Sequence, residues 1–248
     1  MNGGQEGGLD SVGCAMRGKI KIEIAVESVE AALAAERGGA DRIELCADLA
    51  CGGLTPDAQT MRRARKDLRI PIHAMIRPKR GDFIYDEKCF EEMRREIALA
   101  KDEGMNGVVL GILCADRSVD VAATRALVEL ARPMEVTFHR AFDASRDLLE
   151  ALEEVISSGA TRVLTSGGAN DALGGVSVLR ELVQAAGERI TVMPGGGIHG
   201  ENFAEVRSAS GAWEFHSGLG TVMPHGSPDL GRFEAEVQKI VEVAKRNG

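Results

Sequence analysis

The segment KIKIEIAVESVEAALAAERGGADRIELCA (19–47) predicts two short strands joined by one helix. Its two ends, 19–26 and 42–47, are rich in β-branched and other apolar residues, as strands are. The residues between these runs place apolar side chains at helical spacing and end at Gly38-Gly39, a common stop for a helix. The segment is therefore one complete strand–helix unit followed by the next strand.

The same alternation continues to the C-terminal end of the chain. Six further apolar runs follow: IPIHAMI (70–76), GVVLGIL (107–113), EVTFHR (135–140), TRVLTS (161–166), RITVMP (189–194) and AWEFHS (212–217). Consecutive runs begin 23 to 37 residues apart, a spacing that suits one strand and one helix each. Two of the intervening segments, 86–104 and 145–159, again show helical spacing and end at a glycine.

Eight such units predict an α/β chain folded as a single (β/α)8 barrel, the TIM barrel, over residues 19–248. An open doubly wound sheet is the alternative, but it usually carries a glycine-rich turn after its first strand, where this chain has VES (26–28). We expect the aperiodic, glycine-rich residues 1–18 to form a short disordered leader, within which Met16 is an alternative start. The loop RPKRGDFIYD (77–86) is expected to cover part of the barrel mouth.

Composition narrows the classes of partner. The net charge of −8 and the scarcity of aromatic residues, at 4%, argue against a nucleic-acid partner. No apolar run approaches the ~20 residues that span a bilayer, so we expect no membrane association. Five cysteines in a chain of 248 residues predict reduced thiols in the cytoplasm. The amphipathic helices suggest a homodimer or higher homo-oligomer, although the sequence does not locate its surface.

Polar residues recur at the carboxyl ends of the predicted strands, where barrel enzymes place their active sites. The candidate acid–base residues are Glu44, His73, His139, Asp143 and His216. The candidate substrate-binding residues are Arg77, Gly195, Gly196, Gly197 and Ser217. We expect these groups to share one cavity if the polar phase of the strands faces the barrel axis. Between His139 and Arg140, the apolar phase of Val136 and Phe138 favours His139 as the inward residue.

Each of these residues also has a structural interpretation. A single strand histidine is more often a packed core residue, whereas three histidines at three strand ends favour a shared site. The triplet 195–197 permits close approach of an anion to backbone N–H groups, but it equally suits a tight turn. No lysine lies at a strand end, which disfavours Schiff-base chemistry.

The sequence contains no CxxC or HExxH zinc motif. Cys46 and Met75 are predicted to lie on adjacent strands and to face one cavity. Soft sulfur ligands select Cu(I), so Cys46 is the candidate metal ligand. The alternative is that both are ordinary half-buried side chains.

Six blocks of the chain together resemble the CutC copper homeostasis family. The blocks are 26–56, IPIHAMIRPKRGDFIYD (70–86), VTFHRAFD (136–143), RVLTSGG (162–168), VMPGGGI (192–198) and EFHSG (214–218). The resemblance implies a cytoplasmic TIM barrel, often oligomeric, that is linked to copper tolerance and to Cu(I) binding.

The chain departs from the family pattern at one thiol. Family members often carry a cysteine in a pattern like EVCVES, where this chain has Ala25 in EIAVES. The second family cysteine is retained as Cys46, and Cys51 is the nearest substitute for the first. Two functions therefore stand side by side. The resemblance implies copper homeostasis, and the strand ends indicate an enzyme acting on a small anionic or phosphorylated metabolite by acid–base chemistry.

Overall fold

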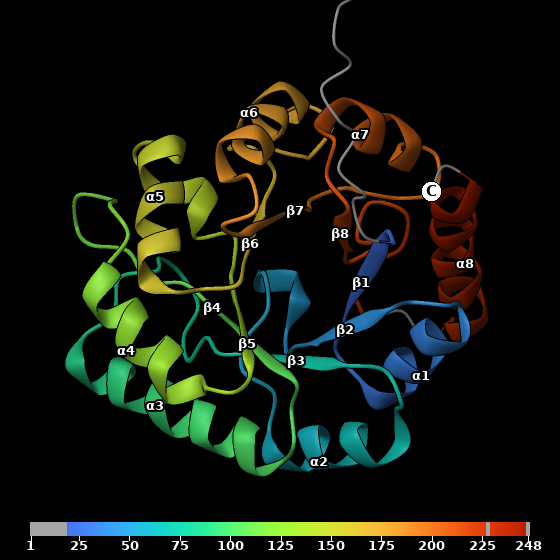
Figure 1. Ribbon diagram of the computed structural model, residues 1–248. Coiled ribbons are helices and arrows are strands. Elements are labelled where there is room, and N and C mark those ends of the chain that lie inside the picture. The colour runs from blue at the N-terminus through green and yellow to red at the C-terminus, as the bar shows by residue number, and fades with distance from the viewer. Residues whose placement is uncertain (1–18, 227–228, 247–248) are drawn as a thin grey trace, which may run out of the picture.

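The computed structural model describes residues 19–226 and 229–246, which form an eight-stranded parallel sheet surrounded by eight helices (Figure 1). The strands are β1 (Lys21–Val26), β2 (Arg42–Leu45), β3 (Ile72–Met75), β4 (Gly107–Leu110), β5 (Glu135–Phe138), β6 (Arg162–Thr165), β7 (Thr191–Pro194) and β8 (Glu214–Ser217). The helices are α1 (Val29–Arg37), α2 (Ala58–Asp67), α3 (Glu87–Asp102), α4 (Val121–Ala131), α5 (Leu148–Ser158), α6 (Val176–Ala186), α7 (Phe203–Ser210) and α8 (Leu230–Arg246). Short 3-10 turns, η1 (Leu49–Cys51) and η2 (Phe142–Ala144), follow β2 and β5.

The strands pair in parallel in the order β7-β6-β5-β4-β3-β2-β1-β8. The two ends of this order, β7 and β8, lie in contact, so the sheet curls nearly into a closed ring with the helices outside (Figure 1). The predicted TIM barrel is confirmed, and the open doubly wound sheet is excluded. The predicted leader, 1–18, lies outside the described residues.

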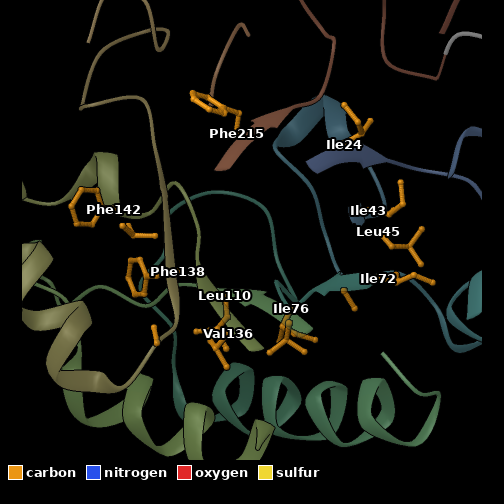
Figure 2. Close-up of a cluster of buried hydrophobic side chains, with 14 of the residues drawn as sticks. Ile24, Ile43, Leu45, Ile72, Ile76, Leu110, Val136, Phe138, Phe142 and Phe215 are labelled. Carbon is orange, nitrogen blue, oxygen red and sulfur yellow. The ribbon is translucent and has the colours of Figure 1, made fainter. Parts of the chain in front are cut away.

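Most strands present an apolar row to the helices and polar side chains to the barrel axis, whereas β4 (GVVL) carries no polar side chain. Figure 2 shows Leu110 and Val136, and Ile76 just after β3, on the side of the sheet that faces the surrounding helices. On the opposite face, buried ion pairs connect Glu23 of β1, Arg42 of β2 and Glu214 of β8. The interior of this barrel therefore holds charged and imidazole side chains where branched apolar residues usually pack.

Acidic and hydroxyl side chains cap the N-termini of helices α1 to α5. Ser28 Oγ accepts a hydrogen bond from the N–H of Ala31 at 3.1 Å, and Asp147 caps α5 by accepting from the N–H groups of Leu149 and Glu150. Such caps satisfy N–H groups that have no partner inside the helix. None of the helices in the described part of the chain is long and apolar enough to cross a bilayer.

Candidate functional site

A cavity of about 420 Å³ opens at the carboxyl ends of the strands. Its size lies within the range of pockets that bind small molecules. Six of the predicted site residues line it: Glu44, Arg77, His139, Gly196, Gly197 and His216. The loop predicted to cover the mouth contributes Phe83, whose ring lies 4.9 Å from the Arg77 guanidinium carbon and 4.9 Å from the centre of the His139 ring.

A network of buried ion pairs lies beneath the cavity. Arg42 donates to Glu23 and, at 2.8 Å, to Glu214, which also accepts from Arg162 Nε at 2.6 Å. Burial opposes the charge on Glu23, but the Arg42 guanidinium outweighs burial and holds the pKa of that carboxyl well below its ordinary value. The network therefore supplies a fixed, ionised carboxylate directly under the cavity.

Glu44 and His216 form a pair at the cavity floor. His216 Nδ1 lies 2.8 Å from Glu23 Oε1, and because Glu23 is ionised, Nδ1 carries the proton. His216 Nε2 lies 3.6 Å from Glu44 Oε2. Burial raises the pKa of Glu44 to about 7. Burial opposes protonation of His216, but Glu44 and Glu23 outweigh it and raise that pKa, so the pair can donate or accept a proton near neutral pH.

The same three side chains satisfy the geometry of a cation site. Glu23, Glu44 and His216 each offer a donor atom, and these atoms lie within 4.8 Å of one another. Two carboxylates and an imidazole are borderline or hard ligands, which suit divalent ions better than Cu(I).

Three buried polar atoms of cavity residues have no hydrogen-bond partner within the described part of the chain: Glu44 Oε1, Arg77 Nε and His139 Nε2. The N–H of Ala141 donates to His139 Nδ1 at 3.1 Å, which leaves the imidazole proton on Nε2. Burial and the nearby Arg77 lower the pKa of His139 to about 3. His139 is thus a neutral donor, and unpaired groups of this kind are costly unless a ligand or water satisfies them.

Gly107 of β4 and Gly111, just after this strand, provide the space that two inward histidines occupy. A Cβ atom on Gly111 would lie 2.5 Å from His139 Nδ1, and one on Gly107 would lie 2.6 Å from the His73 ring. His73 lies deeper than the cavity, with Nδ1 4.0 Å from Glu23 Oε2. Burial lowers the pKa of His73 to about 4, so this predicted acid–base residue is a neutral part of the floor.

The glycines after β7 form a different environment from those after β6. Gly196 and Gly197 have φ values of 102° and 69°, and no protein acceptor among the described residues takes their N–H groups. The Arg140 guanidinium lies beside them, with Nη1 3.3 Å from the position of a Cβ on Gly196. By contrast, the N–H groups of Gly167 and Gly168 already donate to Thr165 and Asp143. The first pair is therefore free to bind an anion.

Three residues predicted to bind substrate or to act as acid–base groups do not line the cavity and instead make structural contacts. Asp143 accepts from Arg140 Nε at 2.7 Å and from the N–H groups of the loop after β6. Ser217 Oγ donates to the carbonyl of Ile198 at 2.6 Å. Gly195 is a close-packing position, because its Cβ would lie 2.4 Å from a Leu164 methyl group.

Glu23 and Arg140 are site residues that the predicted set leaves out. Glu23 has a sequence signal, since it belongs to the polar period-two phase of its strand. Arg140 has none, because it follows His139 directly and reaches the cavity only where the strand has ended.

The predicted metal ligand Cys46 lies just under the cavity wall beside Met75. A Cβ on Gly53 would lie 3.1 Å from Cys46 Sγ and 3.2 Å from the Met75 methyl carbon, so both sulfur side chains meet at this glycine. Burial, followed by Glu44, raises the pKa of the Cys46 thiol well above its ordinary value. Cys51 lines the cavity and its thiol donates to the Asp48 carbonyl at 3.2 Å.

Comparisons with known proteins cover most of the barrel. The CutC family model matches residues 20–221. A family protein CutC from Chromobacterium violaceum is 47% identical over 196 residues, which are 79% of each chain. A copper homeostasis protein cutC homolog from Homo sapiens is 46% identical over 195 residues, 79% of this chain and 71% of the human one.

Solved structures agree with this assignment. A CutC structure from Streptococcus agalactiae has a TM-score of 0.77 at 29% identity, covering 80% of this chain and 98% of that chain. Phosphoribosylanthranilate isomerase from Thermotoga maritima has a TM-score of 0.61 at 14% identity, covering 92% of this chain and 99% of that chain, and shows a shared fold alone. The matching family model and the relatives above 40% identity show that this chain belongs to the CutC family.

Proposed function

We propose that this protein takes part in copper homeostasis and binds Cu(I) through Cys46 and Met75. Relatives named as copper homeostasis proteins support the role. The observation that carries the binding site is the meeting of the two sulfur side chains at Gly53, both buried. A thiolate and a thioether are soft ligands, and they suit Cu(I) better than the oxygen donors nearby. Binding displaces the thiol proton of Cys46.

Competition for Cu(I) tests this site. The reduced protein is titrated with Cu(I) against a chromogenic Cu(I) chelator. We expect Cys46→Ser to weaken binding by at least tenfold and Met75→Leu to weaken it less, while Cys89→Ser on α3 leaves it unchanged. Cys51→Ser reports whether the thiol at the cavity wall is a third ligand. Wild-type affinity in Cys46→Ser overturns the assignment.

We also propose a cytoplasmic location and assembly as a homodimer or a higher homo-oligomer. The four cysteines in the described residues are free thiols, as is usual in a reducing compartment. Light scattering on the purified chain measures the assembly, and a monomeric mass contradicts it.

A second candidate function is acid–base catalysis on a small anionic or phosphorylated metabolite. The unpaired N–H groups of Gly196 and Gly197, together with Arg140, favour it because they form an anion site on one side of the cavity. Glu44 and His216 line the same cavity, with His216 Nε2 3.6 Å from Glu44 Oε2, and would exchange a proton with the bound molecule. An anion held by preorganised donors next to a proton-transfer pair is a common arrangement in enzymes.

Calorimetry with inorganic phosphate tests this anion site. We expect Arg140→Gln to weaken phosphate binding about tenfold, because it removes the charge beside the two glycines. The matched control is Arg189→Gln, which breaks an exposed ion pair with Glu153 at a distance from the cavity. Absence of phosphate binding, or equal affinity in the two variants, overturns this candidate.

A further inference from the structure

We call the cavity at the carboxyl ends of the strands the mouth cavity. A second hollow, of about 390 Å³, lies next to it. It is bounded by the start of α1, the start of α8 and the loop after β8, and we call it the side groove. Five residues belong to the walls of both hollows: Ala25, Leu49, Gly218, Leu219 and His225. The two hollows therefore adjoin along these residues.

Most of the exposed surface of the side groove is apolar. Its walls include Ala31, Met223 and Phe233, and three of its four polar side chains, Glu27, Ser28 and Glu30, accept a hydrogen bond, while the fourth, His225, is exposed. Glu27 accepts from the N–H of Leu49 at 2.7 Å, and Ser28 accepts from the N–H of Ala31. None of the buried unpaired polar atoms in the described part of the chain belongs to a residue of this groove. The groove therefore favours an apolar group.

The mouth cavity differs from the side groove because its walls carry unpaired polar groups. It contains the unpaired Nε2–H of His139, the unpaired Nε of Arg77 and the free N–H groups of Gly196 and Gly197. These four groups are donors and favour an oxyanion, whereas Glu44 Oε1 is the unpaired acceptor among the buried atoms of the described cavity lining. Donors in one hollow and apolar walls in the adjoining one specify a ligand with two unlike ends.

The residue at the junction is held in an unusual backbone conformation. Leu219 has φ of 54°, in the region that favours glycine, although it is 2% exposed. Its N–H donates to Ser217 Oγ at 3.1 Å, and its carbonyl accepts from the N–H of Met223 at 2.9 Å. Strain that neighbouring bonds maintain is frequent at ligand sites, and here it shapes the wall common to both hollows.

We propose that the small-molecule ligand of this protein is an amphiphile, with a phosphate or carboxylate head in the mouth cavity and an apolar chain or ring in the side groove. The proposal rests on the second candidate function, because it takes the anion site of that function as the place of the head group. It adds the class of molecule that the site selects.

Two probes separate the head group from the apolar group. Calorimetry on the full chain compares inorganic phosphate with n-hexyl phosphate. We expect hexyl phosphate to bind at least tenfold more tightly, because its alkyl chain leaves water for the side groove. Equal affinity for the two probes overturns the proposal while leaving the anion site intact. If neither probe binds, the second candidate function is overturned and this proposal falls with it.

A pair of matched substitutions locates the alkyl chain. Ala31 is the third residue of α1, where an acidic side chain suits the start of a helix, so Ala31→Asp keeps the fold and puts a carboxylate into the side groove. We expect it to abolish the advantage of hexyl phosphate and to leave phosphate affinity unchanged. Ala123→Asp makes the same change at the third residue of α4, which lines neither hollow, and should behave as wild type. A retained advantage in Ala31→Asp overturns the proposal.

Discussion

Gly107 and Gly111 of the fourth strand and its following loop show how single residues shape the barrel interior. In the register between β3 and β4, Gly107 lies directly opposite His73, and the imidazole fills the space that a side chain on Gly107 would occupy. Gly111 does the same for His139. The positions of the inward histidines therefore depend on glycine in and just after the neighbouring strand as much as on their own rotamers.

The first prediction concerns Gly107→Ala. We expect this change to lower the free energy of unfolding by about 1–3 kcal/mol, because the new Cβ would lie 2.6 Å from the His73 ring in a packed interior. The backbone at Gly107 does not have positive φ, so the cost comes from packing and not from backbone strain. Chemical denaturation measures it.

Two further variants isolate this packing effect. Gly231→Ala in α8 is the control, since its nearest neighbour lies 3.7 Å away and alanine favours a helix, so no loss is expected. In a His73→Ala background, Gly107→Ala should cost much less. An unchanged cost in that background shows that the imidazole is not the cause.

At the residue scale, the sequence predicts part of the site for a clear reason. Glu44 and His216 belong to the polar phase of their strands, and period-two alternation is enough to place them in one cavity. The role of Gly107 depends on the register between strands, which alternation within one strand does not contain. Asp143 has the residue type of a catalyst, but its contacts arise only when two loops meet.

At the scale of elements, Asp143 connects the turn η2 to the loop after β6. Its carboxylate accepts from Thr165 Oγ1 at 2.5 Å, from the N–H of Gly168 at 3.0 Å and from Arg140 Nε at 2.7 Å. One side chain thus joins the ends of two neighbouring strands and aims the guanidinium at Gly196. Asp143 acts on the anion site through Arg140 and is a positioning residue.

The second prediction follows from these contacts. We expect Asp143→Asn to lower the free energy of unfolding by about 1–3 kcal/mol, because an amide nitrogen replaces an oxygen that accepts from backbone N–H groups. It should also weaken phosphate binding, since Arg140 loses its anchor. Glu153→Gln, at an exposed ion pair, should leave the free energy of unfolding close to that of the wild type. Wild-type phosphate affinity in Asp143→Asn contradicts the positioning role.

The predicted strand runs contain every strand but extend past several of them. The run 107–113 includes Ile112 and Leu113, which are 3% and 5% exposed, yet β4 ends at Leu110. Leu113 instead forms an isolated antiparallel bridge with Val119 in the following loop. An apolar run in the sequence predicts which residues are buried. The end of a strand depends instead on where its backbone stops pairing with the neighbouring strands.

At the scale of the whole molecule, the spacing of the repeats predicts the barrel because each unit of 23 to 37 residues contains one strand and one helix. The charge balance of the interior is harder to foresee. The carboxylates of Glu23 and Glu214 are balanced by the guanidiniums of Arg42 and Arg162 only when the first, second, sixth and eighth strands come together in the ring. With these charges paired, the remaining buried titratable groups determine how stability responds to pH.

The third prediction is the pH dependence of unfolding. Histidine has an ordinary pKa near 6.5, whereas burial lowers those of His139 and His73 to about 3 and about 4. Below pH 6.5 the unfolded chain gains protons that the folded chain does not, so each histidine makes stability fall as the pH falls toward its folded pKa. The raised pKa values of Glu44 and His216 act in the opposite sense, since their stabilisation is lost as the pH rises. The wild-type curve is the sum of the two effects.

Comparison with His139→Asn isolates one contribution to that sum. Asparagine does not titrate, and its Oδ1 can still accept the N–H of Ala141 that His139 Nδ1 now accepts. Each pKa unit corresponds to about 1.4 kcal/mol. Between pH 7 and pH 4 the free energy of unfolding of the wild type should therefore fall, relative to that of the variant, by on the order of 3 kcal/mol. Denaturant unfolding over this pH range measures the difference, with His199→Gln, outside the cavity lining, as the control. Parallel curves for wild type and His139→Asn would mean that His139 takes up its proton at the same pH in the folded and unfolded chains. The assignment of His139 as a buried neutral donor in the mouth cavity would then be wrong.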